Sequence, residues 1–184
     1  MAEHVCPWWM GYFLASPIRR WFEDPEKMLG PYLREGMTVL EPGPGMGFFT
    51  LPMARMVGET GRVIAVDVQP RMLEGLRRRA DHAGLLGRIE LHRAQQDSLG
   101  VEDLRGKVDL VVAVHVVHEM PSDEEFFRQA AETLRPGGRL LLVEPRGHVK
   151  PEKFTHELHS ASDAGLAMSE RVMGGRSSTV LLAK

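Results

Sequence analysis

The chain has 184 residues, 43% of them hydrophobic and 26% charged, which is the composition of one ordinary folded domain. A formal charge of −2, from 23 basic and 25 acidic residues, excludes the basic surface excess typical of nucleic-acid-binding proteins, so we expect no nucleic-acid partner. The only cysteine, Cys6, excludes an intrachain disulfide and a cysteine-based metal framework, and it favours a cytoplasmic location.

Residues 1–36 form an aromatic-rich N-terminal leader in which we expect short helices. Asp24 followed by Pro25 predicts a helix start, because aspartate caps a first turn and proline fits the first helical position. The uncharged run Val5–Ile18 is too short to span a bilayer and lacks the basic start of a signal peptide, so we expect no stable membrane insertion. The leader is interpreted as a lid over a cleft, as core packing or as a membrane-surface contact, and the three alternatives stay open.

Residues 37–184 alternate between short apolar runs and helical patterns, which predicts one α/β domain. The expected strands are 37–41, 62–67, 88–92, 108–117, 139–144, 167–173 and 179–183, and the expected helices are 48–57, 70–83, 122–134 and 151–165. Strands that are apolar throughout are buried on both faces, and alternation with helices implies a doubly wound, Rossmann-like parallel sheet with helices on both faces. Ligands of such sheets bind beyond the carboxyl ends of the strands.

A glycine-rich turn follows the first expected strand, and an acidic residue closes the second. Gly43, Gly45 and Gly47 recur at every second position after Glu41, so the backbone can turn sharply and approach a ligand where a Cβ would collide. Asp67 can accept hydrogen bonds from both hydroxyls of a ribose. Together these residues predict that a nucleoside lies across the strand ends.

The spacing of the glycines distinguishes between two candidate cofactors that contain a nucleoside, NAD and S-adenosyl-L-methionine. Phe48 stands where the third glycine of the dinucleotide fingerprint G-x-G-x-x-G would be. Glu41, two positions before Gly43, would repel a pyrophosphate but would favour a ligand that carries an ammonium and a sulfonium. The sequence therefore predicts S-adenosyl-L-methionine rather than NAD, with S-adenosylhomocysteine as the product.

Four segments resemble successive motifs of class I (Rossmann-like) S-adenosylmethionine-dependent methyltransferases, of the small methyltransferase-domain type similar to ubiquinone and menaquinone methyltransferases. These segments are residues 39–50, 63–73, 108–121 and 134–145. The resemblance implies a seven-stranded sheet whose last strand is antiparallel. It also implies that Glu41 and the glycines hold the methionine part of the cofactor, that Asp67 holds the ribose, and that Val68 packs against the adenine.

The loop after the third strand departs from the family pattern. Such families often carry Gly-Asp-Ala there, and the aspartate meets the adenine amino group. If Leu99 sets the register, Gln95 takes that position, and its amide oxygen can accept the same hydrogen bond. If the loop is one turn longer, Asp97 takes it. We prefer Gln95, and the reading in which neither residue touches the adenine stays open.

Three histidines are the candidate catalytic residues on the acceptor side. Methyl transfer from a sulfonium needs alignment, and it needs a general base only where the acceptor must lose a proton. His115 and His118 lie at the end of the fourth expected strand; they point to opposite faces if the strand continues, and both can line the cleft if it turns into a loop. His148 lies in a second polar segment where a base could act, residues 144–148, at the end of the fifth strand. The resemblance places His115 beside the cofactor and His118 near the acceptor, without establishing a base. A purely structural role for these histidines stays open. We expect no metal, because His156 and His159 have a suitable spacing but no third ligand.

The sequence thus predicts an S-adenosylmethionine-dependent methyltransferase acting on a small-molecule acceptor. Two alternatives are a non-catalytic S-adenosylmethionine-binding module and an NAD-dependent oxidoreductase. The acceptor, the attacking atom and the oligomeric state, a homodimer included, stay open at this point.

Overall fold

The computed structural model describes residues 23–95, 97–172 and 175–184, and it divides into two compact units that separate between Ala94 and Gln95. Most of the expected leader, including Cys6 and Val5–Ile18, lies outside the described residues, so its three interpretations stay predictions. Within the described residues, none of the helices has the length and apolar character needed to cross a membrane.

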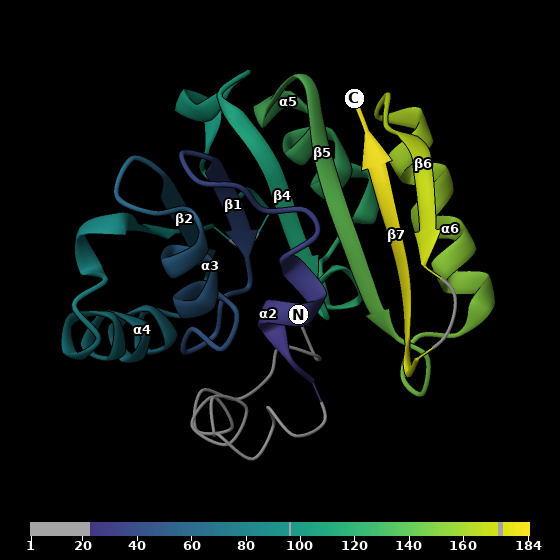
Figure 1. The fold of residues 1–184 in the computed structure, drawn as a ribbon. Coiled ribbons are helices and arrows are strands. Elements are labelled where there is room, and N and C mark those ends of the chain that lie inside the picture. Colours follow the sequence, from purple (N-terminus) through teal and green to yellow (C-terminus); the bar gives the residue numbers. More distant parts are fainter. Residues whose placement is uncertain (1–22, 96, 173–174) are drawn as a thin grey trace. The chain divides into compact units, whose positions relative to one another are not determined.

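The first unit contains a parallel three-stranded sheet, drawn from purple to teal in Figure 1. Its elements are the helices α2 (Pro25–Leu29), α3 (Thr50–Met56) and α4 (Pro70–His82), the 3-10 helix η2 (Leu86–Arg88), and the strands β1 (Thr38–Pro42), β2 (Arg62–Asp67) and β3 (Ile89–Arg93). Strand β2 lies between the other two and pairs with both in parallel, with Glu41 opposite Ala65 and Asp67 opposite Arg93. The carboxyl ends of β1 and β2 are therefore neighbours.

Local sequence explains the helices of this unit. As predicted, Pro25 begins α2, and the Asp24 carboxylate accepts hydrogen bonds from the backbone N–H groups of Glu26 at 3.1 Å and Lys27 at 3.3 Å. Helix α4 packs against β2 and β3 through one apolar face, since its buried side chains recur at helical spacing. These side chains are Met72, Leu73, Leu76 and Ala80.

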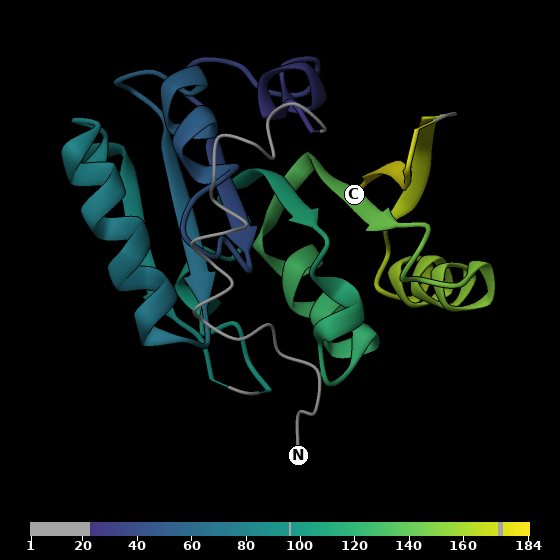
Figure 2. The ribbon, with the colours of Figure 1, turned by 90° about the horizontal axis from the view of Figure 1, so that it is seen from below.

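The second unit contains the remaining four strands. Its elements are the strands β4 (Val108–Val114), β5 (Leu134–Pro145), β6 (Ala167–Val172) and β7 (Ser177–Ala183), the helices α5 (Asp123–Thr133) and α6 (Pro151–Asp163), and the 3-10 helices η3 (Glu102–Leu104) and η4 (Val117–Glu119). Strands β4 and β5 are parallel, whereas β7 is antiparallel to both β5 and β6. Helices α5 and α6 contact each other, and α6 runs beside β6 and β7 (Figures 1 and 2).

The seven strands are ordered β3-β2-β1-β4-β5-β7-β6, which confirms the predicted mostly parallel, seven-stranded sheet with an antiparallel last strand. Strand β4 is buried along most of its length, as its near-continuous run of apolar, valine-rich residues predicts. Edge strand β6, in contrast, is exposed at all six of its residues.

Element boundaries differ from the expected ones in three informative places. Strand β4 ends at Val114 rather than at residue 117, because His115 adopts a left-handed backbone conformation with φ of 55° and the chain turns into η4. Strand β5 begins at Leu134, since that residue already pairs with Val108. Helix α3 begins at Thr50, two residues after the expected start.

Candidate functional site

The glycine-rich turn joins β1 to α3 in the first unit, and its glycines have different structural roles. The N–H of Gly43 donates to the carbonyl of Val66 at 2.9 Å, which ties the turn to the end of β2. A Cβ on Gly47, where φ is 86°, would lie 2.4 Å from the side chain of Leu76, so this glycine permits packing on α4. Gly45, with φ of 54°, has no atom of the described chain within 4 Å of the place where a Cβ would be. The backbone at Gly45 therefore borders open space.

Helix α4 also supports this turn directly. The guanidinium of Arg79 donates a hydrogen bond to the backbone carbonyl of Met46, 33 positions earlier in the chain. Burial lowers the pKa of Arg79 below its ordinary value. The same helix thus orders the turn through Leu76 packing against Gly47 and through a charged donor.

Glu41, at the carboxyl end of β1, is a buried acid with an unused oxygen. Its side chain is 3% exposed, and Oε2 has no hydrogen-bond partner among the described residues. Burial raises the pKa of Glu41 to about 8; the charge of Asp67 adds to the rise and the nearby hydroxyl of Thr50 opposes it. A buried carboxyl left in this state is costly unless a ligand supplies a hydrogen-bond donor or a positive charge.

Asp67 and Val68 follow β2 at the neighbouring strand end. Asp67 is 8% exposed, and its Oδ1 accepts a hydrogen bond from the N–H of Gln69 at 2.8 Å. This bond fixes the side chain at the start of α4. Val68 is 38% exposed, one of three exposed large apolar side chains among the described residues. The first unit therefore brings together Glu41, Gly43, Gly45, Gly47, Asp67 and Val68, as the sequence predicts.

The two adenine candidates lie in the second unit, and both are exposed. The N–H of Gln95 donates to the carbonyl of Ser98 at 2.9 Å. The carbonyl of Asp97 accepts from the Gln129 amide at 3.4 Å, and that amide also accepts from the N–H of Leu99 at 2.7 Å. These contacts order the loop against α5, and both adenine roles stay predictions.

The two histidines after β4 point to different partners. Because the chain turns after Val114, the alternative in which the strand continues through both histidines is wrong. The N–H of His115 donates to the carbonyl of Val143 at 2.8 Å, and its ring Nε2 lies 3.4 Å from the hydroxyl of Ser177 on β7. His118 is instead turned toward Glu144, near the end of β5.

His118 and Glu144 form a close pair in the second unit. His118 Nδ1 lies 2.5 Å from Oε2 of Glu144, whose other oxygen accepts from the N–H of Val117 at 2.9 Å. Since the carboxylate can only accept, Nδ1 carries the proton, which leaves Nε2 of a neutral ring as a base. Burial lowers the pKa of His118, but Glu144, with Glu119 and Glu157 adding, outweighs it and leaves the pKa raised.

The pair of His118 and Glu144 is accessible to solvent only on the side of His118. Glu144 is completely buried, whereas the His118 side chain keeps 12% of its surface exposed. The ring of His148 lies edge-on to that of His118, with centroids 5.0 Å apart. Two of the predicted catalytic histidines are therefore neighbours, and a buried acid holds one of them in a defined tautomer.

Helices α5 and α6 share a second group of charged residues beside this pair. Lys153 on α6 donates to both carboxylate oxygens of Asp123 at 2.7 Å, and His156 Nδ1 lies 2.8 Å from the same carboxylate. Burial opposes ionisation of Asp123, but the hydrogen bonds from Lys153 and His156 leave its pKa below the ordinary value. In the parts of the chain that the structure describes, no three His, Cys, Asp or Glu residues are grouped to hold a metal ion.

Of two acids in the second unit, sequence reasoning placed Glu144 only as part of the polar segment 144–148, without a role of its own, and it did not single out Glu157. Glu144 ends an apolar strand, and a charged residue there is a recognisable signal for a role at the sheet edge. Glu157 is spaced three residues from Phe154 and four from Ala161, both buried, so helical periodicity places it on the apolar face of α6. An acid on such a face could have been identified as unusual.

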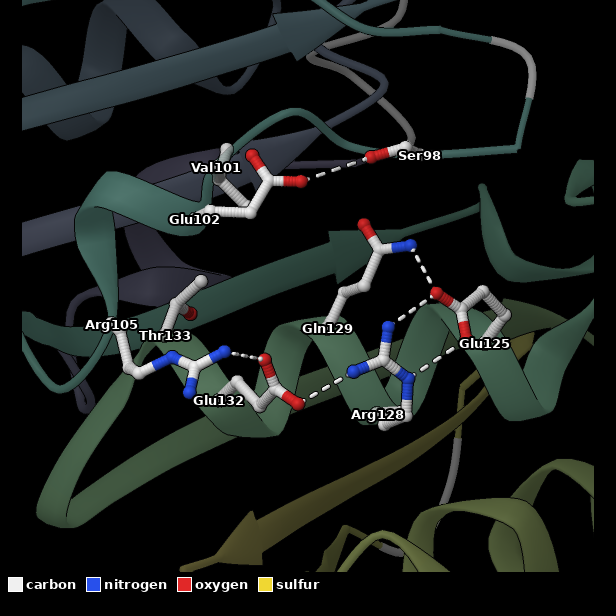
Figure 3. Close-up of a pocket in the computed structure, with 9 residues that line it drawn as sticks. All are labelled: Ser98, Val101, Glu102, Arg105, Glu125, Arg128, Gln129, Glu132 and Thr133. Carbon is white, nitrogen blue, oxygen red and sulfur yellow. Dashed lines mark hydrogen bonds and ion pairs between the residues drawn. The ribbon is translucent and has the colours of Figure 1, made fainter.

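The pocket in Figure 3 lies between η3 and α5 and is bordered by charges that satisfy one another. Arg128 pairs with Glu125 at 2.6 Å and with Glu132 at 2.5 Å, and Arg105 pairs with Glu132 at 2.9 Å. Charges that are already paired give a ligand little to bind. We therefore assign no chemistry to this pocket.

Comparison with known proteins identifies a family and curated relatives for part of the chain. Residues 39–138 match the family described as "Methyltransferase domain". The chain is 34% identical over 112 residues to the ubiquinone/menaquinone biosynthesis C-methyltransferase UbiE of Salmonella arizonae, a match that covers 61% of this chain and 44% of that protein. The chain thus spans less than half the length of this curated relative.

Solved structures give the same picture of the fold. A SAM-dependent methyltransferase from Aquifex aeolicus is 26% identical, with a TM-score of 0.85 over 97% of this chain and 98% of that one. The [4+2]-cyclase SpnF is 19% identical, with a TM-score of 0.67 over 79% of this chain and 57% of that one. The second likeness concerns the fold alone, and it indicates that this fold supports more than one reaction.

Proposed function

The chain belongs to the methyltransferase-domain family, and from that membership we propose that it transfers a methyl group from S-adenosylmethionine to a small-molecule acceptor. The observation that carries the proposal is the buried carboxyl of Glu41, which has one oxygen without a hydrogen-bond partner in the described chain. The glycine-rich turn begins two residues later, so a ligand that lies along the turn would meet this acid.

The residues of the first unit fit S-adenosylmethionine in charge and in shape. An ammonium beside Glu41 would satisfy its unpartnered oxygen and would stabilise its ionised form. The space beside Gly45 would admit the part of the ligand that lies against the backbone of the turn. Asp67 would accept hydrogen bonds from the ribose, and the exposed Val68 would cover one face of the adenine. When bound, the sulfonium supplies an activated methyl group.

In the second unit, we propose that His118 is the general base for an acceptor that must lose a proton. Glu144 holds Nδ1 of His118, so Nε2 can take a proton, and the carboxylate stabilises the imidazolium that forms. The likeness to C-methyltransferases of ubiquinone and menaquinone biosynthesis favours a hydroxylated, quinol-type ring as the acceptor. His148, beside His118, would then contact that ring.

The remaining residue assignments complete this proposal. Gln95, with Asp97 as the alternative, would accept the hydrogen bond of the adenine amino group. His115 is proposed as a cofactor neighbour whose ring is oriented by Ser177. Residues 37–184 would form the catalytic domain and residues 1–36 its leader.

Binding and turnover can be tested separately with the purified chain. We expect S-adenosylhomocysteine to bind in a calorimetric titration and NADH to give no heat; binding of NADH alone would refute the cofactor. With methyl-labelled S-adenosylmethionine, we expect label in a hydroquinone or other phenolic acceptor from a small panel. Glu59→Gln, a change at an exposed acid of the same unit, is the matched control and should leave binding unchanged.

A non-catalytic S-adenosylmethionine-binding module is the second candidate, since a [4+2]-cyclase shares the fold. The two functions predict different outcomes for the same preparation. Binding of S-adenosylhomocysteine without label transfer to any member of a pooled metabolite extract would support the binding module. Label transfer that is lost in His118→Ala would support the enzyme.

A further inference from the structure

A buried acid on α6 has no hydrogen-bond partner, and the proposed chemistry does not use it directly. Glu157 is 0% exposed, and neither of its carboxylate oxygens has a hydrogen-bond partner among the described residues. Most buried acids are paired, so an unpaired one needs a reason. Replacement by an apolar residue would remove the cost of burial, which makes a structural role alone a poor explanation.

The charged groups that influence Glu157 include both members of the His118–Glu144 pair. Its charge interacts with Glu144 and His118, the two members of the close pair, and with Lys153 and Asp123 at the contact between α5 and α6. Burial and the charge of Glu144 raise the pKa of Glu157 to about 7, while Lys153 and His118 oppose the rise. Glu157 therefore changes its charge in the pH range in which a histidine base works.

We propose that Glu157 is a positioning residue that acts through His118, and that its buried carboxylate keeps the imidazole basic enough to take a proton from the methyl acceptor. This inference rests on the proposed function of His118 as a base. During the reaction the proton would move from a hydroxyl of the acceptor to Nε2 of His118, and the electron pair of the broken O–H bond would stay on the acceptor, where it makes the attacking atom more nucleophilic. The positive charge on His118 would then be stabilised by its contact with Glu144 and by the more distant charge of Glu157.

The direction of the coupling follows from the charges around the ring. A carboxylate near His118 favours imidazolium and raises the pKa of His118, so removal of the Glu157 charge must lower it. The increase in the His118 pKa that Glu157 causes is complete above the pKa of Glu157, and it vanishes below that pKa because the acid is then neutral. The charged groups that bear on this equilibrium are Glu144 from β5, Glu119 from η4, Asp123 from α5 and Lys153 from α6.

An NMR titration of the His118 ring tests the coupling without any need for turnover. In Glu157→Gln, which keeps the shape and removes the charge, we expect the titration midpoint of His118 to fall by about 0.5 to 1 pH unit. Glu157→Asp keeps a charge and should lie between this variant and the unchanged chain. Glu152→Gln, at an exposed acid of the same helix, is the matched control and should leave the midpoint unchanged.

The pH profile of methyl transfer supplies a second readout that loss of packing would not reproduce. A weaker base stays unprotonated at lower pH but takes a proton less readily. The acidic limb of the Glu157→Gln profile should therefore move to lower pH by about 0.5 to 1 pH unit, and the plateau rate should fall several-fold. Affinity for S-adenosylhomocysteine should not change. An unshifted His118 midpoint in Glu157→Gln, or in Glu157→Met should the first variant not fold, overturns this inference. A shifted midpoint in a chain that transfers no methyl group refutes the proposed function instead.

Discussion

Replacement of Glu41 by glutamine should make the free chain more stable at alkaline pH and should weaken cofactor binding at the same time. The carboxyl has a pKa of about 8 in the folded chain against 4.5 as its ordinary value, chiefly because burial disfavours its charge. A raised carboxyl pKa means that the folded state holds its proton more tightly than the unfolded chain does. The destabilisation is therefore absent below about pH 4.5, grows as the pH rises, and is complete above about pH 8.

The magnitude follows from the same two values. At about 1.36 kcal/mol for each pH unit, the difference corresponds to at most about 5 kcal/mol of unfolding free energy near pH 9. Glutamine has the same shape and no charge to bury, so Glu41→Gln should gain on the order of 2 to 5 kcal/mol at that pH. Near pH 4.5 the two proteins should have nearly equal stability, because the acid is then protonated in the folded state. Urea unfolding of both proteins at the two pH values measures the difference.

Binding gives the other half of the prediction. To pair with the ammonium of S-adenosylhomocysteine, Glu41 must ionise, so binding near pH 7 should release close to one proton, and Glu41→Gln should release none. Calorimetry in buffers with different ionisation enthalpies measures this proton directly. Equal pH dependence of stability in the two proteins, or equal affinity for the ligand, would refute the reasoning that assigns this acid to the cofactor.

Four further substitutions test the same two groups of residues. Asp67→Ala should weaken S-adenosylhomocysteine binding by about 1–3 kcal/mol in calorimetry, because charge-assisted hydrogen bonds are lost, and unchanged affinity would contradict the ribose role. His118→Ala should lower turnover by about 10²- to 10⁴-fold with intact cofactor affinity, and full activity would reduce this residue to a structural one. Gly47→Ala should destabilise the fold in a thermal melt by about 1–3 kcal/mol, since its Cβ would collide with Leu76. Gly45→Ala should melt closer to the unchanged chain while binding less cofactor, and a reversed order would contradict the assigned roles.

Much of the fold, and the placement of Glu41 and Asp67 at neighbouring strand ends, could be predicted from the sequence, because both depend on local patterns. Alternation of buried strands with helices predicts the sheet, and the position of Glu41 and Asp67 at the ends of β1 and β2 follows from their place in the chain. The cap at Asp24 is a similar local signal and is confirmed. Patterns of this kind need no knowledge of contacts between distant residues.

The arrangement around His118 could be predicted only in part, since it depends on contacts between elements far apart in the chain. His118 was a candidate from its position, but its tautomer and basicity come from Glu144, 26 residues later. The left-handed backbone at His115, which separates the two histidines, leaves no clear trace in the sequence because histidine is only modestly favoured there. Glu157 could be recognised as unusual on an apolar helix face, but its neighbours could not be named from spacing alone.

The contacts around the glycine-rich turn have a consequence for the entropy of binding. A segment with three glycines would have large conformational freedom by itself, and a ligand that had to order it would lose affinity. Here the donor from Arg79 and the bond between Gly43 and Val66 restrict the segment as soon as the first unit folds. The entropic cost of ordering the turn is therefore part of the free energy of folding, and a ligand that bound along the turn would meet a segment that is already ordered.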